Sequence, residues 1–321
     1  MNKALLIEHY RQRQFSQEQI DQALLALDRA DQALHALDSS LDSAGIEEIR
    51  AVLDQWIVDQ SNDLESILAL ARYYYLIGKK DQYVYFTRLI GGLGVIDTIK
   101  ERFETILAGQ SFEAAIHVKE PPLGSDPSEV PAFTATFMKQ LESVTDEKQT
   151  QDILCGNNHN LDKAAFMKEK TLYEASPSME VYLKDLHQRR VKELQDYCDQ
   201  DKVWFEQKIT QATVDFVASN QELLSAVLKD DTLYLTKIPY DPQSYLNATD
   251  PLQKRYCACH CPFAREAILK GEPHISKNWC YCSAGFEKFH FETILDRQLD
   301  ITVLESALQG DPICRFAISL K

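Results

Sequence analysis

Residues 301–320 read ITVLESALQGDPICRFAISL and carry the strongest strand signal in the chain. Two apolar runs flank Gly310-Asp311-Pro312, and these three residue types are typical of tight turns. In the second run, from Cys314 to Leu320, apolar residues alternate with polar or smaller ones, and a period of two places alternate side chains on one face of a strand. The stretch therefore predicts a β-hairpin, and a β-type run over 232–239 predicts a further strand.

The first third of the chain is typical of helices instead. Ser16 and Gln19 have the spacing of a capping box, and apolar residues recur at helical spacing after it. Residues 69–83 resemble one helix–turn–helix of a tetratricopeptide repeat. No second copy follows at the period of roughly 34 residues, and a solenoid needs about three copies. A small helical bundle is the prediction.

A proline-rich stretch separates the two patterns. Residues 117–131 contain Pro121, Pro122, Pro127 and Pro131, and proline suits neither a helix interior nor a central strand. The sequence thus predicts three parts of an α+β protein. They are a helical bundle over 1–116, a linker over 117–131, and a cysteine-rich α+β domain with a small antiparallel sheet over 132–321.

Composition narrows the classes of function. The formal net charge is -15, which repels a phosphate backbone, and the basic residues of 187–192 lie on a helical pattern beside acidic ones, typical of a solvated helix face. No apolar run approaches the roughly 18 residues of a membrane span, and the start shows no secretory signal. We expect no nucleic-acid partner, no membrane partner and a cytoplasmic location.

The cysteines point to chemistry at one place. Of eight cysteines, five fall within 257–282, and clustered thiols in a reducing compartment are more often metal ligands or catalytic groups than disulfides. Two Cys-x-Cys pairs supply four thiolates, which makes Cys257, Cys259, Cys280 and Cys282 the candidate metal ligands. Zinc, an iron–sulfur cluster, a redox-active thiol pair and buried thiols around a ligand pocket all fit this spacing.

Catalysis is the rival interpretation of the same residues. Cys282 lies where a helix is predicted to begin, and the helix dipole there should lower its thiol pKa. Cys282 or Cys280 would then be the nucleophile and His260 the base of a hydrolase. Cys155 and His159 are a second thiol–imidazole candidate, although a helix C-cap with incidental neighbours explains them as well.

Three further residues are candidates for ligand binding: Glu305, Arg265 and Trp279. Glu305 stands inside an apolar strand run, where a charge needs a partner or a ligand, and Arg265 or Arg255 could supply the partner. A solvent-facing Glu305 is the alternative. His290, on a predicted helix rich in phenylalanine, is expected to be structural.

Roughly residues 132–321 resemble an uncharacterised bacterial family of unknown function, the DUF6144 type. The matching segments are Val144–Lys148, Cys155-Gly156, Tyr256–Cys259, Trp279–Phe286, Leu304–Gly310 and Cys314–Ile318. The resemblance implies no activity. The chain departs from the family pattern in two places: His159 stands where a second cysteine is usual, and Cys261 is added.

The closing hairpin is also similar to the end of vinyl-4-reductase-type small-molecule-binding domains and of aminothiazoline-carboxylate hydrolases. That resemblance implies an α/β sandwich-like domain around a pocket bounded by sheet, helices and cysteines. The leading expectation is a sensor-like protein that binds a small molecule of unknown identity and carries a thiolate metal site. The alternatives are a cysteine-dependent hydrolase of a small cyclic or amide substrate, and an adaptor that binds a protein through its N-terminal helices.

Overall fold

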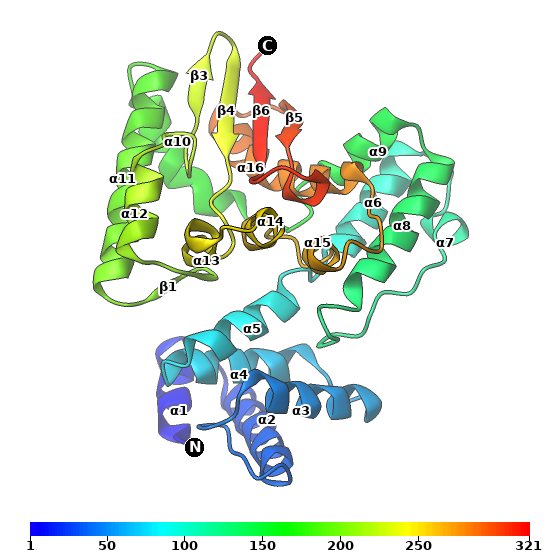
Figure 1. Cartoon of the computed structure of the whole chain (residues 1–321), viewed down its shortest axis with the longest axis vertical. Helices are drawn as coiled ribbons and strands as arrows, with labels where there is room; N and C mark the ends of the chain where they lie inside the picture. The colour runs from blue at the N-terminus through cyan, green and yellow to red at the C-terminus, as the bar shows by residue number, and fades with distance from the viewer. The chain divides into compact units, whose positions relative to one another are not determined.

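The chain forms two compact units. The computed structural model describes residues 1–321 and groups Met1–Gly91 with Glu120–Val130 in unit 1, and Gly92–Lys119 with Pro131–Lys321 in unit 2 (Figure 1). The boundaries differ from those expected from sequence, because residues 92–116 join unit 2 and most of the proline-rich stretch joins unit 1. The prediction that two parts fold as separate domains stays a prediction.

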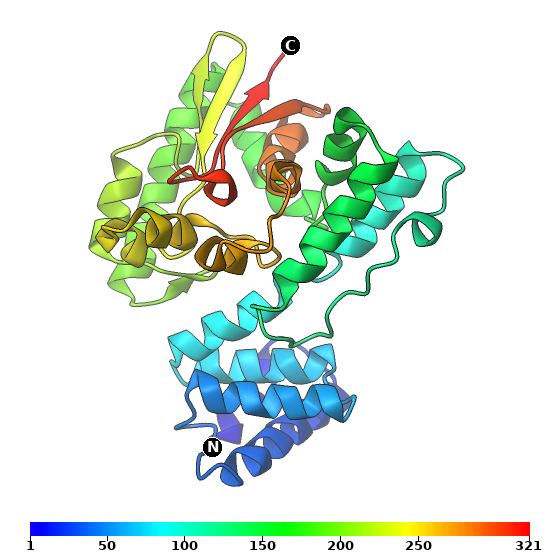
Figure 2. The ribbon, with the colours of Figure 1, turned by 45° about the vertical axis from the view of Figure 1, so that its right-hand side comes forward.

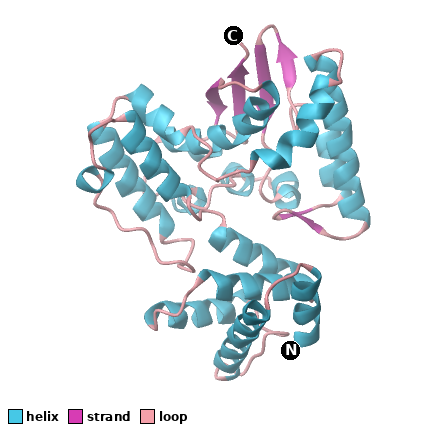
Figure 3. Cartoon of the chain, turned by 180° about the vertical axis from the view of Figure 1, so that it is seen from behind, coloured by secondary structure: helices cyan, strands magenta, loops and turns pink.

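Unit 1 contains helices and loops only, whereas the strands lie in unit 2 (Figure 3). Its helices are α1 (Lys3–Gln12), α2 (Gln17–His35), α3 (Ile46–Val58), α4 (Leu64–Leu76) and α5 (Lys80–Ile90). The capping box expected at Ser16 is present: the Gln19 N–H donates to Ser16 Oγ at 3.2 Å, and the Ser16 N–H donates to Gln19 Oε1 at 2.9 Å. Asp63 caps α4 in the same way through the Ser66 N–H.

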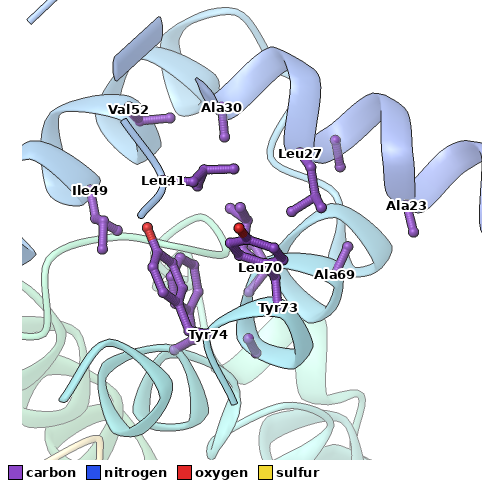
Figure 4. Close-up of a cluster of buried hydrophobic side chains, with 14 of the residues drawn as sticks. Ala23, Leu27, Ala30, Leu41, Ile49, Val52, Ala69, Leu70, Tyr73 and Tyr74 are labelled. Atoms are coloured by element: carbon purple, nitrogen blue, oxygen red, sulfur yellow. The ribbon is translucent and has the colours of Figure 1, made fainter. Parts of the chain in front are cut away.

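The core of unit 1 lies between these helices. Leu27 of α2 and Tyr73 of α4 are fully buried there (Figure 4), and so is Leu53 of α3. Tyr74 stacks on Phe86 of α5, with ring centroids 5.7 Å apart. The tyrosines of α4 are therefore mainly core residues, and burying such large rings is the main source of stability available to a bundle of short helices.

Unit 2 is mostly helical around one small sheet. Its helical segments are α6 (Val95–Ile106), α7 (Phe112–Ala115), α8 (Val130–Val144), α9 (Glu147–Leu154), η1 (Lys163–Phe166), α10 (Met167–Glu174), α11 (Met179–Asp199), α12 (Gln211–Ala218), α13 (Pro242–Asn247), α14 (Pro251–Ala258), α15 (Arg265–Lys270), η2 (Lys277–Cys280), α16 (Tyr281–Leu295) and η3 (Ala307–Gln309). None of the helices combines the length and apolarity that crossing a membrane requires.

The sheet confirms the strand predictions. It has four antiparallel strands in the order β3-β4-β6-β5, with bounds β3 (Val227–Lys229), β4 (Thr232–Thr236), β5 (Asp300–Glu305) and β6 (Arg315–Ser319). The expected hairpin is β5–β6, with η3 and a left-handed Gly310 in its connection. A separate two-stranded ribbon joins β1 (Val203–Trp204) and β2 (Gln207–Lys208). The α+β class is confirmed.

One face of the sheet is covered by helices. Leu233 and Leu235 of β4 lie opposite Ile318 and Phe316 of β6, and all four are buried in one cluster with residues of α11 and α16. Figure 2 shows the orange α16 beside the strands. This packing matters for function, because it fixes the start of α16, and hence Cys282, against one end of the sheet.

Candidate functional site

Thiols from three separate segments meet at the end of the sheet. Cys259 follows α14, Cys280 ends η2, and Cys314 immediately precedes β6. Cys259 packs with Cys261 and Cys314 in one apolar cluster, and Cys280 interacts electrostatically with all three. We call Cys259, Cys261, Cys280 and Cys314 the thiol cluster.

Neighbouring side chains hold two of these sulfurs in place. The Trp279 indole N–H donates to Cys261 Sγ at 3.1 Å, and Trp279 itself is 1% exposed. Cys280 Sγ and Ser306 Oγ are 3.0 Å apart. Trp279 also packs edge-on against Phe137 and Phe263. Trp279, a candidate ligand-binding residue, therefore contacts protein and orients a thiol.

Burial keeps the thiol cluster uncharged at neutral pH. Burial raises the pKa of Cys259, Cys261 and Cys314 to about 12, and each is raised further by neighbouring thiols. The pKa of Cys280 lies well above its ordinary value for the same reasons. Bringing a negative charge into such a site requires a cation that binds the sulfur directly, since desolvation otherwise favours the neutral thiol.

Lys237 places a positive charge beside this cluster. It follows β4, and its backbone N–H donates to the Cys314 carbonyl at 2.9 Å. Its ammonium contacts Glu287 Oε1 at 3.2 Å and Ser283 Oγ at 3.0 Å, with only 14% of the side chain exposed. Burial works against the charged form, but Glu287, Cys314 and Cys261 together hold the pKa of Lys237 above its ordinary value.

Cys257, a predicted ligand, packs in the same apolar cluster as Cys259, Cys261 and Cys314, but its sulfur has partners of its own. It belongs to the last turn of α14, whereas Cys259 follows the helix with an extended backbone. The Cys257 sulfur accepts a hydrogen bond from Gln253 Nε2 at 3.7 Å, and its pKa is raised by burial and by Asp241. No three His, Cys, Asp or Glu side chains are arranged to hold a metal ion, so neither the predicted quartet nor the thiol cluster is assembled as a coordination site.

Cys282 starts α16 as expected, but its pKa moves in the opposite direction to the one expected. Burial raises the pKa of Cys282 to about 11, although Asn158 and Lys237 act to lower it. Loss of solvent outweighs the helix dipole, which contributes little beyond the first turn and is worth about 1 kcal/mol. The sequence-based expectation of a reactive, low-pKa thiol is therefore wrong.

The imidazole nearest Cys282 is His159, not His260. His159 Nε2 lies 3.9 Å from Cys282 Sγ. Burial lowers the pKa of His159 to about 4, so this ring is neutral at pH 7. The adjacent Asn158 is completely buried, its amide donates to the Leu154 carbonyl at 2.5 Å, and its Oδ1 has no hydrogen-bond partner.

The segments that carry the thiol cluster also carry a family signature. Residues 245–321 match the DUF6144 model. The model is described as a family of unknown function. The match confirms the resemblance for the C-terminal region and takes in every residue of the thiol cluster, with Cys257 and Cys282. No curated protein and no solved structure matches the chain.

Lys237 and His159 are supplied from outside the DUF6144 region. The loop after α9 brings His159 to the start of α16 through a close backbone approach. A Cβ added at Gly285 would lie 2.2 Å from the Gly156 carbonyl oxygen. Arg102 holds the end of α9 by donating to the Ile153 carbonyl at 2.9 Å and to the Asp152 carbonyl.

The other predicted candidates are occupied by protein contacts. His260 Nε2 lies 2.5 Å from the Ile238 carbonyl, and burial lowers the His260 pKa well below its ordinary value. The Arg265 guanidinium lies 4.1 Å from the centres of both the Tyr240 and Tyr256 rings, and only 6% of the residue is exposed. These contacts match structural roles more closely than direct ligand binding.

Glu305 also finds a partner that sequence did not suggest. Arg315, its neighbour across β5 and β6, approaches it to 3.9 Å, while Arg255 donates to the Ala307 carbonyl and Arg265 to the Tyr256 carbonyl. The partner proposed from sequence, Arg265 or Arg255, is therefore wrong. Arg315 pairs more closely with Glu222, at 2.7 Å, so Glu305 is a secondary member of a surface ion cluster.

Sequence reasoning missed Lys237 and two of the cluster thiols as ligand candidates. Lys237 could have been found from its position directly after the apolar run of β4, because a charge at the buried end of a strand needs a partner. Cys314 gave no signal of its own. Only the pairing of β4 with β6 brings Lys237 and Cys314 together.

Proposed function

We propose that unit 2 binds a soft metal ion through the thiolates of the thiol cluster. The observation that supports this is the convergence of Cys259, Cys261, Cys280 and Cys314, from three chain segments, beside one buried ammonium. Buried cysteines that serve only as small apolar residues have no reason to collect around a lysine. Thiolates are soft ligands that favour zinc, Cu(I) and iron–sulfur clusters.

The charges of the site are consistent with this ligand class. Four thiolates around Zn²⁺ leave a net charge of about -2, which is costly in a buried site unless cations lie near it. Lys237 supplies one such cation, and Arg265 supplies a second, because it acts to lower the Cys259 pKa. Metal binding would displace the four protons, so affinity should rise with pH.

This ligand set differs from the one that spacing alone suggested. Cys259 and Cys280 belong to both sets, and Cys261 and Cys314 replace Cys257 and Cys282. Side chains would have to move to bring these sulfurs onto one ion, because no three of them are arranged for a metal as they stand. Zinc is the first candidate, with an iron–sulfur cluster as the second. The small-molecule pocket, the sensor role and the adaptor role of unit 1 remain predictions.

Replacing Cys280 or Cys314 with Ser should abolish most metal binding, because each removes one of the proposed ligands. Wild-type protein purified anaerobically should carry about one metal ion per chain by elemental analysis. Cys198→Ser is the matched control. Cys198 lies on α11 and packs in a different hydrophobic cluster, so this variant should keep the bound metal.

The decisive comparison is between Cys314→Ser and Cys257→Ser. Retention of metal by Cys257→Ser and its loss in Cys314→Ser would support the ligand set proposed from the structure. The reverse result would restore the quartet predicted from spacing. Wild-type protein that takes up neither zinc, cobalt nor iron with sulfide under anaerobic reconstitution would refute the proposal.

A cysteine-dependent hydrolase is the second candidate, and the Cys282–His159 contact favours it. A neutral imidazole 3.9 Å from a thiol can accept its proton as the sulfur attacks a carbonyl and later deliver it to the leaving group. Water would then hydrolyse the thioester. This dyad uses His159 as base in place of the predicted His260, whose Nε2 is engaged by a backbone carbonyl.

Iodoacetamide labelling distinguishes the two candidates. We expect Cys282 and the thiol cluster to label slowly in native protein at pH 7, because their pKa values are raised and only the thiolate reacts. Peptide mapping should show Cys198 labelled first. Several cluster cysteines should be labelled together once a chelator removes the metal, because loss of the metal also loosens the structure that buries them. Fast labelling of Cys282 alone, slowed by His159→Gln, would favour the hydrolase.

A further inference from the structure

The proline-rich segment crosses unit 1 as an extended strap. We call residues Glu120–Val130 the strap; they lie between parts of the chain that belong to unit 2. Its apolar anchor is Leu123, which packs against the core of unit 1. The next residue, Gly124, is buried with φ +87°, and a Cβ there would lie 3.5 Å from Ile67. The backbone therefore lies close against α3 and α4.

Polar side chains of unit 1 form a hydrogen bond and ion pairs with the strap near Leu123. Asn62 Nδ2, just before α4, donates to the Leu123 carbonyl at 2.8 Å. Arg50 of α3, which pairs with Asp54 of its own helix at 2.6 Å, also forms ion pairs with Asp126 at 3.3 Å and Glu129 at 4.0 Å, and its side chain is only 15% exposed. The face thus recognises a backbone carbonyl, an apolar side chain and carboxylates three and six residues later.

These contacts resemble the way in which a surface binds a separate peptide. The strap residues before Val130 form no helix or strand, and their backbone hydrogen bonds are local turns, such as Ser125 N–H to the Pro122 carbonyl. One partly buried leucine, the hydrogen bond from Asn62 and ion pairs with half-exposed acids hold the strap. A competing segment of the same chemistry would restore every contact.

We propose that the face of α3 and α4 that holds Leu123 and Asp126 is a docking site for extended segments of a partner protein, and that the strap is its internal ligand. The partner segment carries a leucine or similar apolar residue, then small residues, then an acid three positions after the apolar one. The charge of Arg50 selects acidic segments, and Asn62 selects extended backbone. The strap occupies the docking site and excludes the partner segment until that segment displaces it.

The test uses the full chain and a fluorescent peptide that corresponds to residues 119–131. Wild type should bind this peptide poorly in a fluorescence polarisation titration, because a tethered ligand competes at an effective concentration in the millimolar range. The strap variant Leu123→Ala/Asp126→Ala should bind it about tenfold more tightly, since its own strap no longer competes. Adding Arg50→Gln should remove that gain.

Matched controls keep the test decisive. Pro122→Ala, at an exposed strap position, should behave like wild type, and a peptide with Asp126→Asn should bind the strap variant more weakly. If circular dichroism shows the double variant to be unfolded, Asp126→Asn alone replaces it with the same readout. Equal peptide affinity for wild type and strap variant would overturn the proposal. Dimerisation of the strap variant without peptide would also overturn it, because the face would then bind a second copy.

Discussion

Gly285→Ala should lower the free energy of unfolding by about 3 kcal/mol or more. Alanine in place of a glycine in a helix normally stabilises by about 0.5–1 kcal/mol, so the sign itself is informative. Here the new methyl group would meet the Gly156 carbonyl oxygen at 2.2 Å and the Gly156 nitrogen at 2.8 Å. Both are backbone atoms, which cannot move aside as a flexible side chain can. Urea denaturation followed by circular dichroism measures the change.

Gly156→Ala is the matched control, because Gly156 is the other glycine at the close contact between α16 and the loop after α9. The atoms nearest its new methyl group belong to the Arg102 side chain, which can move by giving up its hydrogen bonds to the end of α9, so the destabilisation should be smaller than a clash with backbone atoms causes. The Gly285 variant should also separate His159 from Cys282, because the loop after α9 must retreat. If Gly285→Ala proves as stable as wild type, the close packing of this loop on α16 is incorrect.

Arg189→Met should lower the free energy of unfolding by about 2–3 kcal/mol at pH 7, because it leaves Glu169 buried without its cation. Glu169 is 8% exposed and forms two hydrogen bonds with Arg189, at 2.7 and 2.8 Å. Its carboxylate also accepts from Tyr182 Oη at 3.2 Å, and Tyr182 in turn contacts His290 Nε2 at 2.8 Å. Burial of both rings makes this network part of the core between α10, α11 and α16.

The effect of Arg189→Met should depend on pH in a defined direction. Burial alone would raise the pKa of Glu169, but Arg189 holds it below the ordinary 4.5. In wild type the pair therefore stabilises the fold above pH 4.5, and that contribution is lost as pH falls through the lowered pKa. In the variant, burial raises the Glu169 pKa, so protonation relieves the buried charge. The gap between the two proteins should begin to narrow as pH falls through that raised pKa, and it should narrow further as pH falls through the lowered pKa of the wild type.

Two controls accompany the Arg189 experiment. Adding Glu169→Gln to Arg189→Met removes the unpaired charge and should recover part of the lost stability. Lys148→Ala breaks an ion pair with Asp152 in which both side chains are largely exposed, and it should change stability by well under about 1 kcal/mol. A gap between wild type and Arg189→Met that stays constant from pH 7 to pH 4 would contradict this account.

Local patterns predicted β4, β5, β6 and several helix starts, but not β1, β2 or β3. Alternation along 314–320 and a glycine turn predicted the hairpin β5–β6, and the capping residues Ser16 and Asp63 mark real helix starts. Each of these signals acts between residues a few positions apart, and so can be read along the chain. The helix that begins beside Cys282 was predictable for the same reason. The DUF6144 resemblance, expected over roughly 132–321, is matched over 245–321.

The site depended on contacts between residues far apart in sequence. The Cys-x-Cys spacing indicated a thiol site but gave no sign of Cys314, which the sheet brings into the same cluster as Cys257 and Cys259. The same holds for His159, which lies 123 residues before Cys282, and for Arg315 as the partner of Glu305. No local pattern contains the strand register that makes these pairs.

The protonation states show most clearly what the sequence determined and what the tertiary structure decided. From sequence, Cys282 lies at a helix N-terminus, and the dipole there favours a thiolate. In the folded chain, packing of α16 against the loop after α9 and the end of the sheet removes solvent from the sulfur and raises its pKa to about 11. A helix dipole is a local property of the chain, whereas desolvation is set by every segment that packs around the group, and in this protein desolvation is the larger effect.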